Sequence, residues 1–287
     1  MSKPLFSFIT CTYQCEHFIR RCYYSLSKQT IQDWEWVIVD DGSTDNTQNL
    51  IKQLIDSRIR YFRFDMNYGP GAARQYALKQ AGGDWCAIID MDDFCFPDRL
   101  EYADKARIAG YDFFCSASLL INNDYLVTGV RRFNNETYPH SFVPASLCGK
   151  TELLQAIGYS KFRRAEDQLM ILTLANNYNG FYCEEPLYIY HETANVNSKK
   201  AFLGKFYLLL ETVRMVYKGT LKFNSAMLLF QIKNIIKIFL LTPFILFPSA
   251  YFWTLRFRNQ VPVSKSLRFD RKEFIHECYI FSKSALR

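Results

Sequence analysis

The first 110 residues alternate short apolar runs with segments of helical periodicity. Four apolar runs are typical of buried strands, at 5–10, 34–39, 59–64 and 85–89. Apolar residues three or four positions apart predict helices between and after them, at 16–28, about 45–55, about 71–81 and 97–108. This order predicts an α/β fold with a mostly parallel central sheet flanked by helices, in which ligands bind at the carboxyl ends of the strands.

The pattern becomes less regular after residue 110. Strands are predicted at 113–120 and 125–131, and a helix at 166–176. We expect these elements to complete one domain at 1–198. Its donor half would cover about 1–110 and its acceptor half about 111–198.

Residues 199–287 differ from the rest in both pattern and charge. Segments 202–216 and 226–240 look helical, apolar and lysine-containing. This part holds 16 Lys and Arg against 4 Asp and Glu, whereas residues 1–198 hold 19 against 24. The whole chain has a net charge of +7, so a mildly acidic body precedes a strongly basic helical extension. We expect that extension to meet an anionic partner, and we expect no nucleic-acid partner.

Composition restricts the class of protein. A hydrophobic fraction of 49% in 287 residues is enough for a substantial core, which excludes wholesale disorder. The nine cysteines form no C-x-x-C pair, and several lie in apolar runs. This usage favours the reduced thiols of a cytosolic protein over a disulfide framework or a zinc site. The N-terminus shows no signal-peptide pattern, which agrees with that expectation.

A cluster of acids follows the fourth predicted strand. Asp90, Asp92 and Asp93 lie at its carboxyl end, where three close carboxylates repel one another unless a cation lies among them. Mg²⁺ or Mn²⁺ prefers such oxygen ligands and keeps positions open for phosphate oxygens. The cluster therefore predicts a divalent ion that bridges to a nucleotide diphosphate, and the alternative is a solvated acidic loop.

Other strand ends carry further candidates for nucleotide binding. Asp41 follows the second strand and could accept a hydrogen bond from a base N–H, or could only shape the turn. Thr10, Thr12 and Tyr13 end the first strand, and the tyrosine ring could stack on a nucleobase. Arg74 follows Gly69-Pro70-Gly71 and could pair with phosphate, or could be an ordinary surface residue of a helix.

Two acids open the helix predicted at 166–176. The helix dipole alone favours acids such as Glu166 and Asp167 in a first turn. The functional alternative is a general base that removes the proton of an acceptor hydroxyl.

Together these segments resemble the large inverting glycosyltransferase family 2, of the GT-A fold, which includes bacterial surface-polysaccharide and O-antigen transferases. The similar strings are FITCTYQ, WVIVDDGSTDNT, NYGPGAARQYAL, GDWCAIIDMDDFCFPDRL and AEDQLM. They follow the order and spacing of the family and cover roughly residues 5–175.

The resemblance implies a role for each matching residue. Tyr13 would stack on the base, Asp41 would bind its edge and Arg74 would contact base or phosphate. Asp92 would touch ribose, diphosphate or metal, Asp93 would hold the metal, and Asp90 would begin the same cluster. Asp167 would be the catalytic base, and its neighbour Glu166 would contact the acceptor or the helix end. His191 resembles, loosely, a family histidine that contacts metal or phosphate.

Some positions depart from the family pattern. The family often has Pro at the position of Cys11 and Asn at that of Gln14, so we expect the base pocket to differ in detail. No Q-x-x-R-W string, typical of processive synthases, follows Asp167. The resemblance therefore implies transfer of a single sugar from a nucleotide-diphosphate sugar, expected to be a UDP-sugar, to a saccharide or lipid-linked saccharide. The reaction would be a metal-dependent single displacement that inverts the anomeric carbon.

An uncharged run at 238–255 has basic residues on both flanks. It is short for a spanning helix and is interrupted by Pro243 and Pro248. We expect it to lie on or dip into the cytoplasmic leaflet of the inner membrane, which would attach the protein peripherally. Burial against the domain or in an oligomer is the alternative. A chain that ends near residue 225 is expected to leave the membrane and keep donor hydrolysis.

Two other functions fit the chain less well. A sugar-nucleotide nucleotidyltransferase would need a Gly-rich phosphate loop after the first strand, where this chain has Thr10-Cys11-Thr12-Tyr13-Gln14. A non-catalytic nucleotide-sugar-binding scaffold is disfavoured by the intact acids at 90–93 and 166–167.

Overall fold

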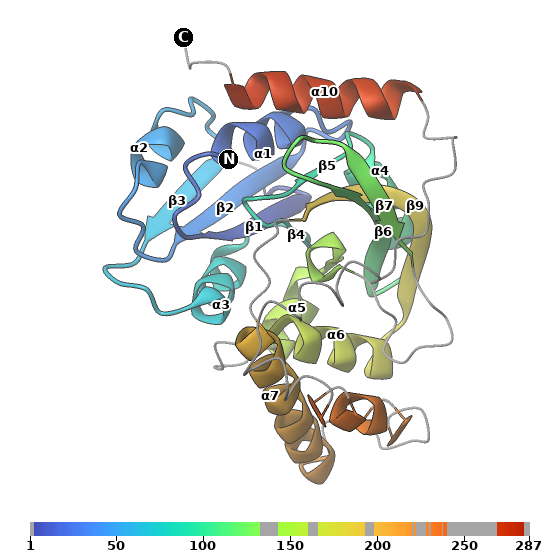
Figure 1. Cartoon of the computed structure of the whole chain (residues 1–287). Coiled ribbons are helices and arrows are strands. Elements are labelled where there is room, and N and C mark those ends of the chain that lie inside the picture. The colour runs from blue at the N-terminus through green and yellow to red at the C-terminus, as the bar shows by residue number, and fades with distance from the viewer. Residues whose placement is uncertain are drawn as a thin grey trace.

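The computed structural model describes residues 3–132, 143–159, 166–192, 198–219 and 269–283, with short helical stretches between 228 and 239. The first half builds a parallel sheet, as predicted (Figure 1). Its strands, in spatial order, are β3 (Ile59–Arg63), β2 (Trp34–Asp40), β1 (Phe6–Thr12) and β4 (Trp85–Ile88). Every residue of β2 and β4 is buried, because helices cover both faces of the sheet.

The second half extends the same sheet with mixed pairing. Its strands are β5 (Phe94–Cys95), β6 (Phe113–Ile121), β7 (Val127–Arg131), β8 (Cys148–Lys150) and β9 (Gly180–His191). β8 pairs antiparallel with both β4 and β6, whereas β9 runs parallel to β6 and antiparallel to β5. The expectation of a mostly parallel sheet is therefore correct for the first half only, and the described sheet as a whole is mixed.

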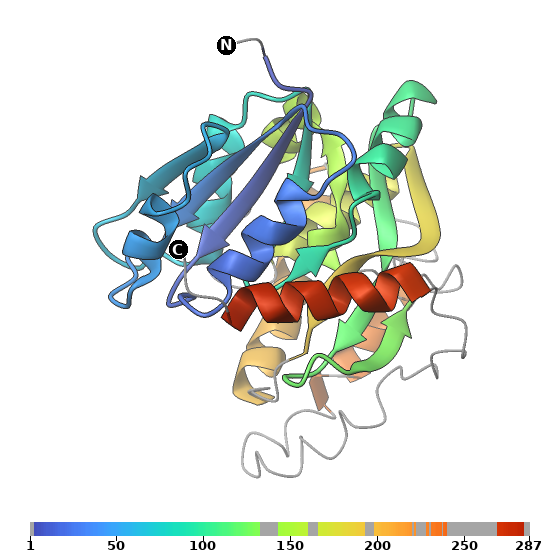
Figure 2. The same cartoon turned by 90° about the horizontal axis from the view of Figure 1, so that it is seen from above.

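Helices lie on both faces of the sheet. The connections of the first half contain α1 (Ile19–Ser27), α2 (Thr47–Lys52), α3 (Pro70–Gln80) and α4 (Arg99–Ile108). The later helices are α5 (Thr151–Ile157), α6 (Glu166–Asn177), α7 (Ser198–Tyr217) and α10 (Phe269–Lys283). Helix α1 lies on one face, and α3 and α5 lie on the other (Figures 1 and 2).

The C-terminal helix α10 packs against the body of the domain, beside α1 (Figure 2). Phe274, Ile275 and Cys278 are buried in a cluster with apolar residues of β5, β6 and β9. Arg271 fixes the helix by an ion pair of 2.7 Å to Asp98. The expected boundary at 198 therefore does not separate α10 from the domain. A chain that ends near residue 225 would lack α10 and uncover this cluster, which disfavours the expectation that it keeps donor hydrolysis.

In the described part of the chain, no helix is both long enough and apolar enough to cross a membrane. The apolar run at 238–255 lies outside the described residues apart from its first two positions.

Candidate active site

Arg74 joins two parts of the chain at the carboxyl edge of the sheet. Its Nη2 donates to Asp90 Oδ1 at 2.7 Å, and its Nη1 donates to both oxygens of Asp167, at 3.0 and 3.2 Å. The arginine side chain is only 10% exposed, so these contacts are shielded from water. The arginine lies in helix α3. Gly69 precedes the helix with a φ of 96°, which suits a residue without a Cβ, and Pro70 in the first turn favours the start of the helix at this point. One guanidinium thus brings an acid of the strand end beside the acid that opens α6.

Tyr159 is a neighbour of this pair that the sequence did not indicate. Its ring is 7% exposed. Burial and then the charge of Asp167 raise its pKa well above the ordinary value, so the phenol is neutral. Its backbone N–H donates to the Gln75 side chain at 2.6 Å, which links the loop before α6 to α3. No pattern around residue 159 could have revealed this contact, because it depends on how α5 packs on α3.

Asp93 faces the core and not the open edge of the sheet. Its carboxylate accepts hydrogen bonds from the Tyr188 hydroxyl at 2.7 Å and the His191 backbone N–H at 2.8 Å. The residue is 1% exposed, and burial, then the charges of Asp92 and Asp90, raises its pKa well above the ordinary value. These two hydrogen bonds tie β9 to the acid cluster. The role of Asp93 as a metal ligand stays a prediction.

Asp92 is the acid of the cluster that stays available. Its side chain is half-buried, and among the described residues no other side chain donates a hydrogen bond to it. Burial and then the charge of Asp90 raise its pKa, and the positive charges of Arg21 and Arg74 offset this rise only in part. A divalent ion such as Mg²⁺ is typically bound by one or two carboxylates together with substrate phosphates and water. Asp92 fits that arrangement, although the described residues contain no preformed group of three or more His, Cys, Asp or Glu ligands.

His191 is buried beside the acid cluster at the end of β9. Its Nδ1 lies 3.5 Å from Arg21 Nη2, and its Nε2 is buried without a hydrogen-bond partner among the described residues. Burial and then the charge of Arg21 lower its pKa to about 4, so the ring is neutral near pH 7. Because arginine can only donate, the neutral ring carries its proton on Nε2. As placed, His191 offers a hydrogen-bond donor suited to a phosphate oxygen, and its contact with a metal stays a prediction.

Asp41 holds the loop that leads into α3. Its two carboxylate oxygens accept the backbone N–H groups of Tyr68 at 2.7 Å and Gly69 at 2.8 Å. Its own N–H donates to the Thr12 carbonyl at 2.8 Å, which joins the ends of β1 and β2. Asp41 is 2% exposed, so the geometry supports the turn-shaping alternative directly. Contact with a nucleobase edge stays a prediction.

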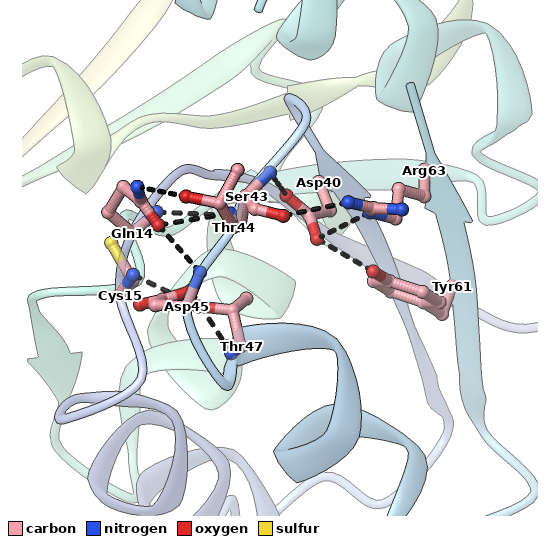
Figure 3. Close-up of polar contacts among 9 residues, drawn as sticks. All are labelled: Gln14, Cys15, Asp40, Ser43, Thr44, Asp45, Thr47, Tyr61 and Arg63. Atoms are coloured by element: carbon pink, nitrogen blue, oxygen red, sulfur yellow. Dashed lines mark hydrogen bonds and ion pairs between the residues drawn. The ribbon is translucent and has the colours of Figure 1, made fainter. Parts of the chain in front are cut away.

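The loop after β1 is clasped to the loop after β2 by Gln14 (Figure 3). Its side-chain oxygen accepts the N–H groups of Thr44 and Asp45 at 3.1 and 3.0 Å, and its own N–H donates to the Ser43 hydroxyl at 3.0 Å. Gln14 adopts a φ of 55°, which is uncommon for a residue other than glycine. The departure from the family's Asn is therefore structural, because the longer side chain reaches across to the second loop.

The three predicted residues of β1 differ in what they can contact. Thr10 is 1% exposed, and its hydroxyl bonds the Ile89 carbonyl and the Trp36 indole, both at 2.8 Å. Thr10 therefore supports the strand ends from within the core and does not face a ligand. Thr12 is also buried, whereas Tyr13 is 46% exposed and its ring is open to stacking. Glu166 begins α6, and its side chain lies outside the described part of the structure.

The opposite placements of Asp92 and Asp93 predict opposite effects on stability. Replacing Asp93 with alanine leaves the Tyr188 hydroxyl and the His191 N–H without their acceptor, so the free energy of unfolding is expected to fall by about 1–3 kcal/mol. The same change at Asp92 is expected to alter it by less than about 0.5 kcal/mol. Urea denaturation of both variants measures the difference. Equal losses would contradict the assignment of Asp93 to the core.

Comparison with known proteins agrees with this architecture. The bacterial enzyme UDP-Glc:alpha-D-GlcNAc-diphosphoundecaprenol beta-1,3-glucosyltransferase WfgD of Escherichia coli is 34% identical over 128 residues, which are 44% of this chain. The chain thus spans about half, 51%, of the length of that relative.

Two solved structures share the fold. Staphylococcus aureus TarS, residues 1–349 in complex with UDP, has a TM-score of 0.61 and 21% identity over 82% of this chain and 70% of its own. The mannosyltransferase PcManGT from Pyrobaculum calidifontis, in complex with GDP-Man and Mn²⁺, has a TM-score of 0.61 and 15% identity over 98% and 88% of the two chains. The fold is therefore the GT-A glycosyltransferase fold.

The sequence profile of the family described as "Glycosyl transferase family 2" matches residues 7–165, more than half of the chain. This range includes the ends of β1, β2 and β4, together with Arg74. The chain therefore belongs to glycosyl transferase family 2.

Proposed function

We propose that this enzyme transfers one sugar from a nucleotide-diphosphate sugar to an acceptor hydroxyl with inversion at the anomeric carbon. The observation that carries the proposal is the Arg74 bridge between Asp90 and Asp167. Asp90, which belongs to the acid cluster that would meet the donor, lies on one side of the guanidinium. Asp167, which would take the acceptor proton, lies on the other side. Donor and acceptor chemistry then share a single site at the carboxyl edge of the sheet.

Asp92 and Arg74 would receive the donor diphosphate. A divalent cation bound by Asp92 would offset the negative charge that develops on the leaving nucleoside diphosphate. His191 would donate from Nε2 to a phosphate oxygen, and Tyr13 would stack on the base. Among these groups, Tyr13 is 46% exposed, Asp92 is half-buried, and His191 Nε2 has no hydrogen-bond partner in the described part of the chain.

Asp167 would act as the general base. The acceptor oxygen forms its bond to the anomeric carbon while the bond from that carbon to the diphosphate oxygen breaks, and the hydroxyl proton passes to the Asp167 carboxylate. The ion pair with Arg74 fixes the direction of this carboxylate before the acceptor arrives. The positive charge of Arg74 would then lie between the negative charge of the donor diphosphate and that of Asp167.

The names of related proteins suggest the substrates. WfgD is named for a UDP-Glc donor and a diphosphoundecaprenol-linked acceptor, and TarS has been solved with UDP-GlcNAc. By this similarity, the donor is a UDP-sugar and the acceptor a lipid-linked saccharide of surface-polysaccharide biosynthesis. Release of nucleoside diphosphate from a panel of nucleotide sugars, with Mn²⁺ or with EDTA, tests the proposal. Release from at least one donor that stops in EDTA is expected, and release unaffected by EDTA would contradict it.

Helix α7 offers a face for the membrane on which such an acceptor resides. Its outer face carries a helically spaced apolar stripe, Phe206, Leu210, Val213 and Tyr217, that is 41, 50, 59 and 92% exposed. Its inner face packs through Leu208, which is 1% exposed. Residues 199–239 hold eight Lys and Arg and one acid, a balance that disfavours contact between copies and favours anionic lipid. We propose peripheral attachment to the cytoplasmic leaflet through this stripe.

Charge placed on the stripe is expected to weaken membrane binding. Leu210→Glu combined with Val213→Glu should reduce the bound fraction on phosphatidylglycerol vesicles at least about tenfold, because both apolar contacts are lost and lipid charge repels the new acids. Ile108→Glu on α4 is the matched control, since Ile108 is 71% exposed on another surface. Vesicle flotation measures binding. This face would be rejected as the membrane contact if the double variant bound vesicles as the parent does. It would also be rejected if the double variant changed the oligomeric mass of the protein and not its vesicle binding.

A further inference from the structure

Arg21 of α1 is a fully buried arginine beside the candidate donor site. Its Nη1 donates to the Tyr125 hydroxyl at 2.7 Å, and its Nη2 donates to the backbone carbonyl of Asp92 and lies 3.5 Å from His191 Nδ1. Its guanidinium carbon also lies 5.0 Å from the ring centre of Phe18 and 5.1 Å from that of Tyr125. The arginine therefore contacts the peptide that carries Asp92 and the ring that supplies the free Nε2.

The charge of Arg21 is not used in an ion pair with any described carboxylate. Arg74 and Arg271 do have such partners, Asp90 and Asp167 for the first and Asp98 for the second, whereas the buried Arg99, like Arg21, bonds backbone carbonyls. A buried cation without a carboxylate costs free energy, and the rings of Phe18, Phe94 and Tyr125 and neutral oxygens only partly offset that cost for Arg21. An acidic residue could have neutralised Arg21 more simply, but it would have added a fourth negative charge to the cluster at 90–93.

Tyr125 reaches Arg21 from the turn between β6 and β7. Its φ of 60° is unusual for an aromatic residue and costs of the order of 1 kcal/mol or more, which the surrounding contacts must offset. Its ring packs 4.9 Å from that of Tyr279 on α10 and 6.2 Å from His191. The hydroxyl bond to Arg21 thus depends on a strained turn that the C-terminal helix supports.

We infer that Arg21, held by Tyr125, is a positioning residue that fixes the Asp92 peptide and the His191 ring for binding of the metal–diphosphate part of the donor. The inference rests on the proposed donor site. Arg21 acts by holding the Asp92 carbonyl, so the side chain of Asp92 keeps one direction. It also occupies His191 Nδ1 and so leaves Nε2 as the donor. Helix α10 joins the site through Tyr125, which gives the docked C-terminal helix a part in donor binding.

The test compares UDP affinity, measured by calorimetry with Mn²⁺ and with EDTA, among full-length variants. Arg21→Gln is expected to weaken UDP binding in Mn²⁺ by about tenfold or more, because a hydrogen-bonded charge is lost. Arg21→Lys should recover only part of this loss, since an ammonium cannot reproduce the fork of a guanidinium. Tyr125→Phe, which removes only the hydroxyl, should weaken binding several-fold. Affinity in EDTA should change little in all three.

Tyr24→Phe is the matched control. It removes a 3.0 Å hydrogen bond from Tyr24 to Glu277 of α10 without touching Arg21 or the acids. It should reduce the free energy of unfolding about as much as Tyr125→Phe and leave UDP affinity unchanged. The inference would be overturned if Tyr125→Phe and folded Arg21→Gln bound UDP in Mn²⁺ as tightly as the parent does. It would also be overturned if these variants lost the same factor of UDP affinity in Mn²⁺ and in EDTA. If Arg21→Gln does not fold, Tyr125→Phe decides alone, and failure of the parent to bind UDP would instead reject the donor site itself.

Discussion

Asp167→Asn is expected to reduce kcat by about 10²–10⁴-fold while UDP affinity stays within about twofold of the parent. The asparagine oxygen can still accept a hydrogen bond from Arg74 Nη1, so the bridge to α6 and the fold should persist. What is lost is the carboxylate that takes the proton, and this loss acts on the transition state and not on donor binding. Steady-state kinetics together with UDP calorimetry separate the two effects.

A matched control for Asp167 is Asp104→Asn. Asp104 also pairs with an arginine, Arg107 at 2.7 Å, but lies on α4 away from the strand ends. Its variant should keep parent kcat and affinity. An Asp167→Asn enzyme that loses UDP affinity but keeps kcat would assign Asp167 to donor binding and remove the proposed base.

Arg74→Gln is expected to damage both stability and activity. It leaves Asp90 and Asp167 close together without their shared cation, and breaking a buried pair typically costs about 3–5 kcal/mol. Because these two carboxylate side chains are 27 and 26% exposed, water offsets part of that cost and a loss of about 2 kcal/mol is expected. UDP affinity should fall as well, since the repelled acids no longer hold one arrangement.

Urea denaturation and UDP calorimetry measure the two losses at Arg74. Arg107→Gln breaks an ion pair of the same 2.7 Å length on the surface of α4, where a loss of less than about 1 kcal/mol is expected. If the two arginine variants were equally stable, the bridge would have no structural role. If Arg74→Gln also kept parent affinity, the proposed shared site would lose its main support.

The first half of the fold could be predicted from the sequence because its elements follow from local patterns. Apolar runs buried on both faces, such as 34–39, have no polar alternation to confuse them with surface strands. Helix α6 and strand β6 also lie where the pattern predicted them. Strand β7 begins at Val127 and not at residue 125, because Tyr125 lies in a turn with positive φ.

The missed elements depend on tertiary contacts. Strand β9 contains Glu184, Glu185 and Pro186, which interrupt any apolar pattern, and its register with β6 shifts opposite that proline. Helix α10 was included in the basic extension because the charge was summed over residues 199–287, although the helix itself holds three Lys and Arg and three acids. Only its packing on α1 and β5 shows that Phe274 and Cys278 belong to the domain.

The sequence predicted which residues lie at the candidate site better than it predicted what each of them contacts. Asp90 and Asp92 lie just beyond the end of β4, and Arg74 of α3 reaches Asp90 there. The sequence predicted both Asp92 and Asp93 as metal ligands, and it could not show that Asp93 also accepts hydrogen bonds from Tyr188 and a backbone N–H. Arg21 could not be predicted as a site residue, because a single arginine in a helix has no pattern that distinguishes it from a surface residue.

The proposed donor site is tested most directly by a calorimetric titration of UDP into the full-length protein and its Asp92→Asn variant, each in Mn²⁺ and in EDTA. The parent is expected to bind UDP in Mn²⁺ and at least about tenfold more weakly in EDTA, because the open Asp92 carboxylate would hold the cation that meets the diphosphate. Asp92→Asn should bind equally weakly in both conditions. Parent affinity that is the same with and without metal, or an Asp92→Asn variant that keeps the parent's metal dependence, would contradict the proposed donor site.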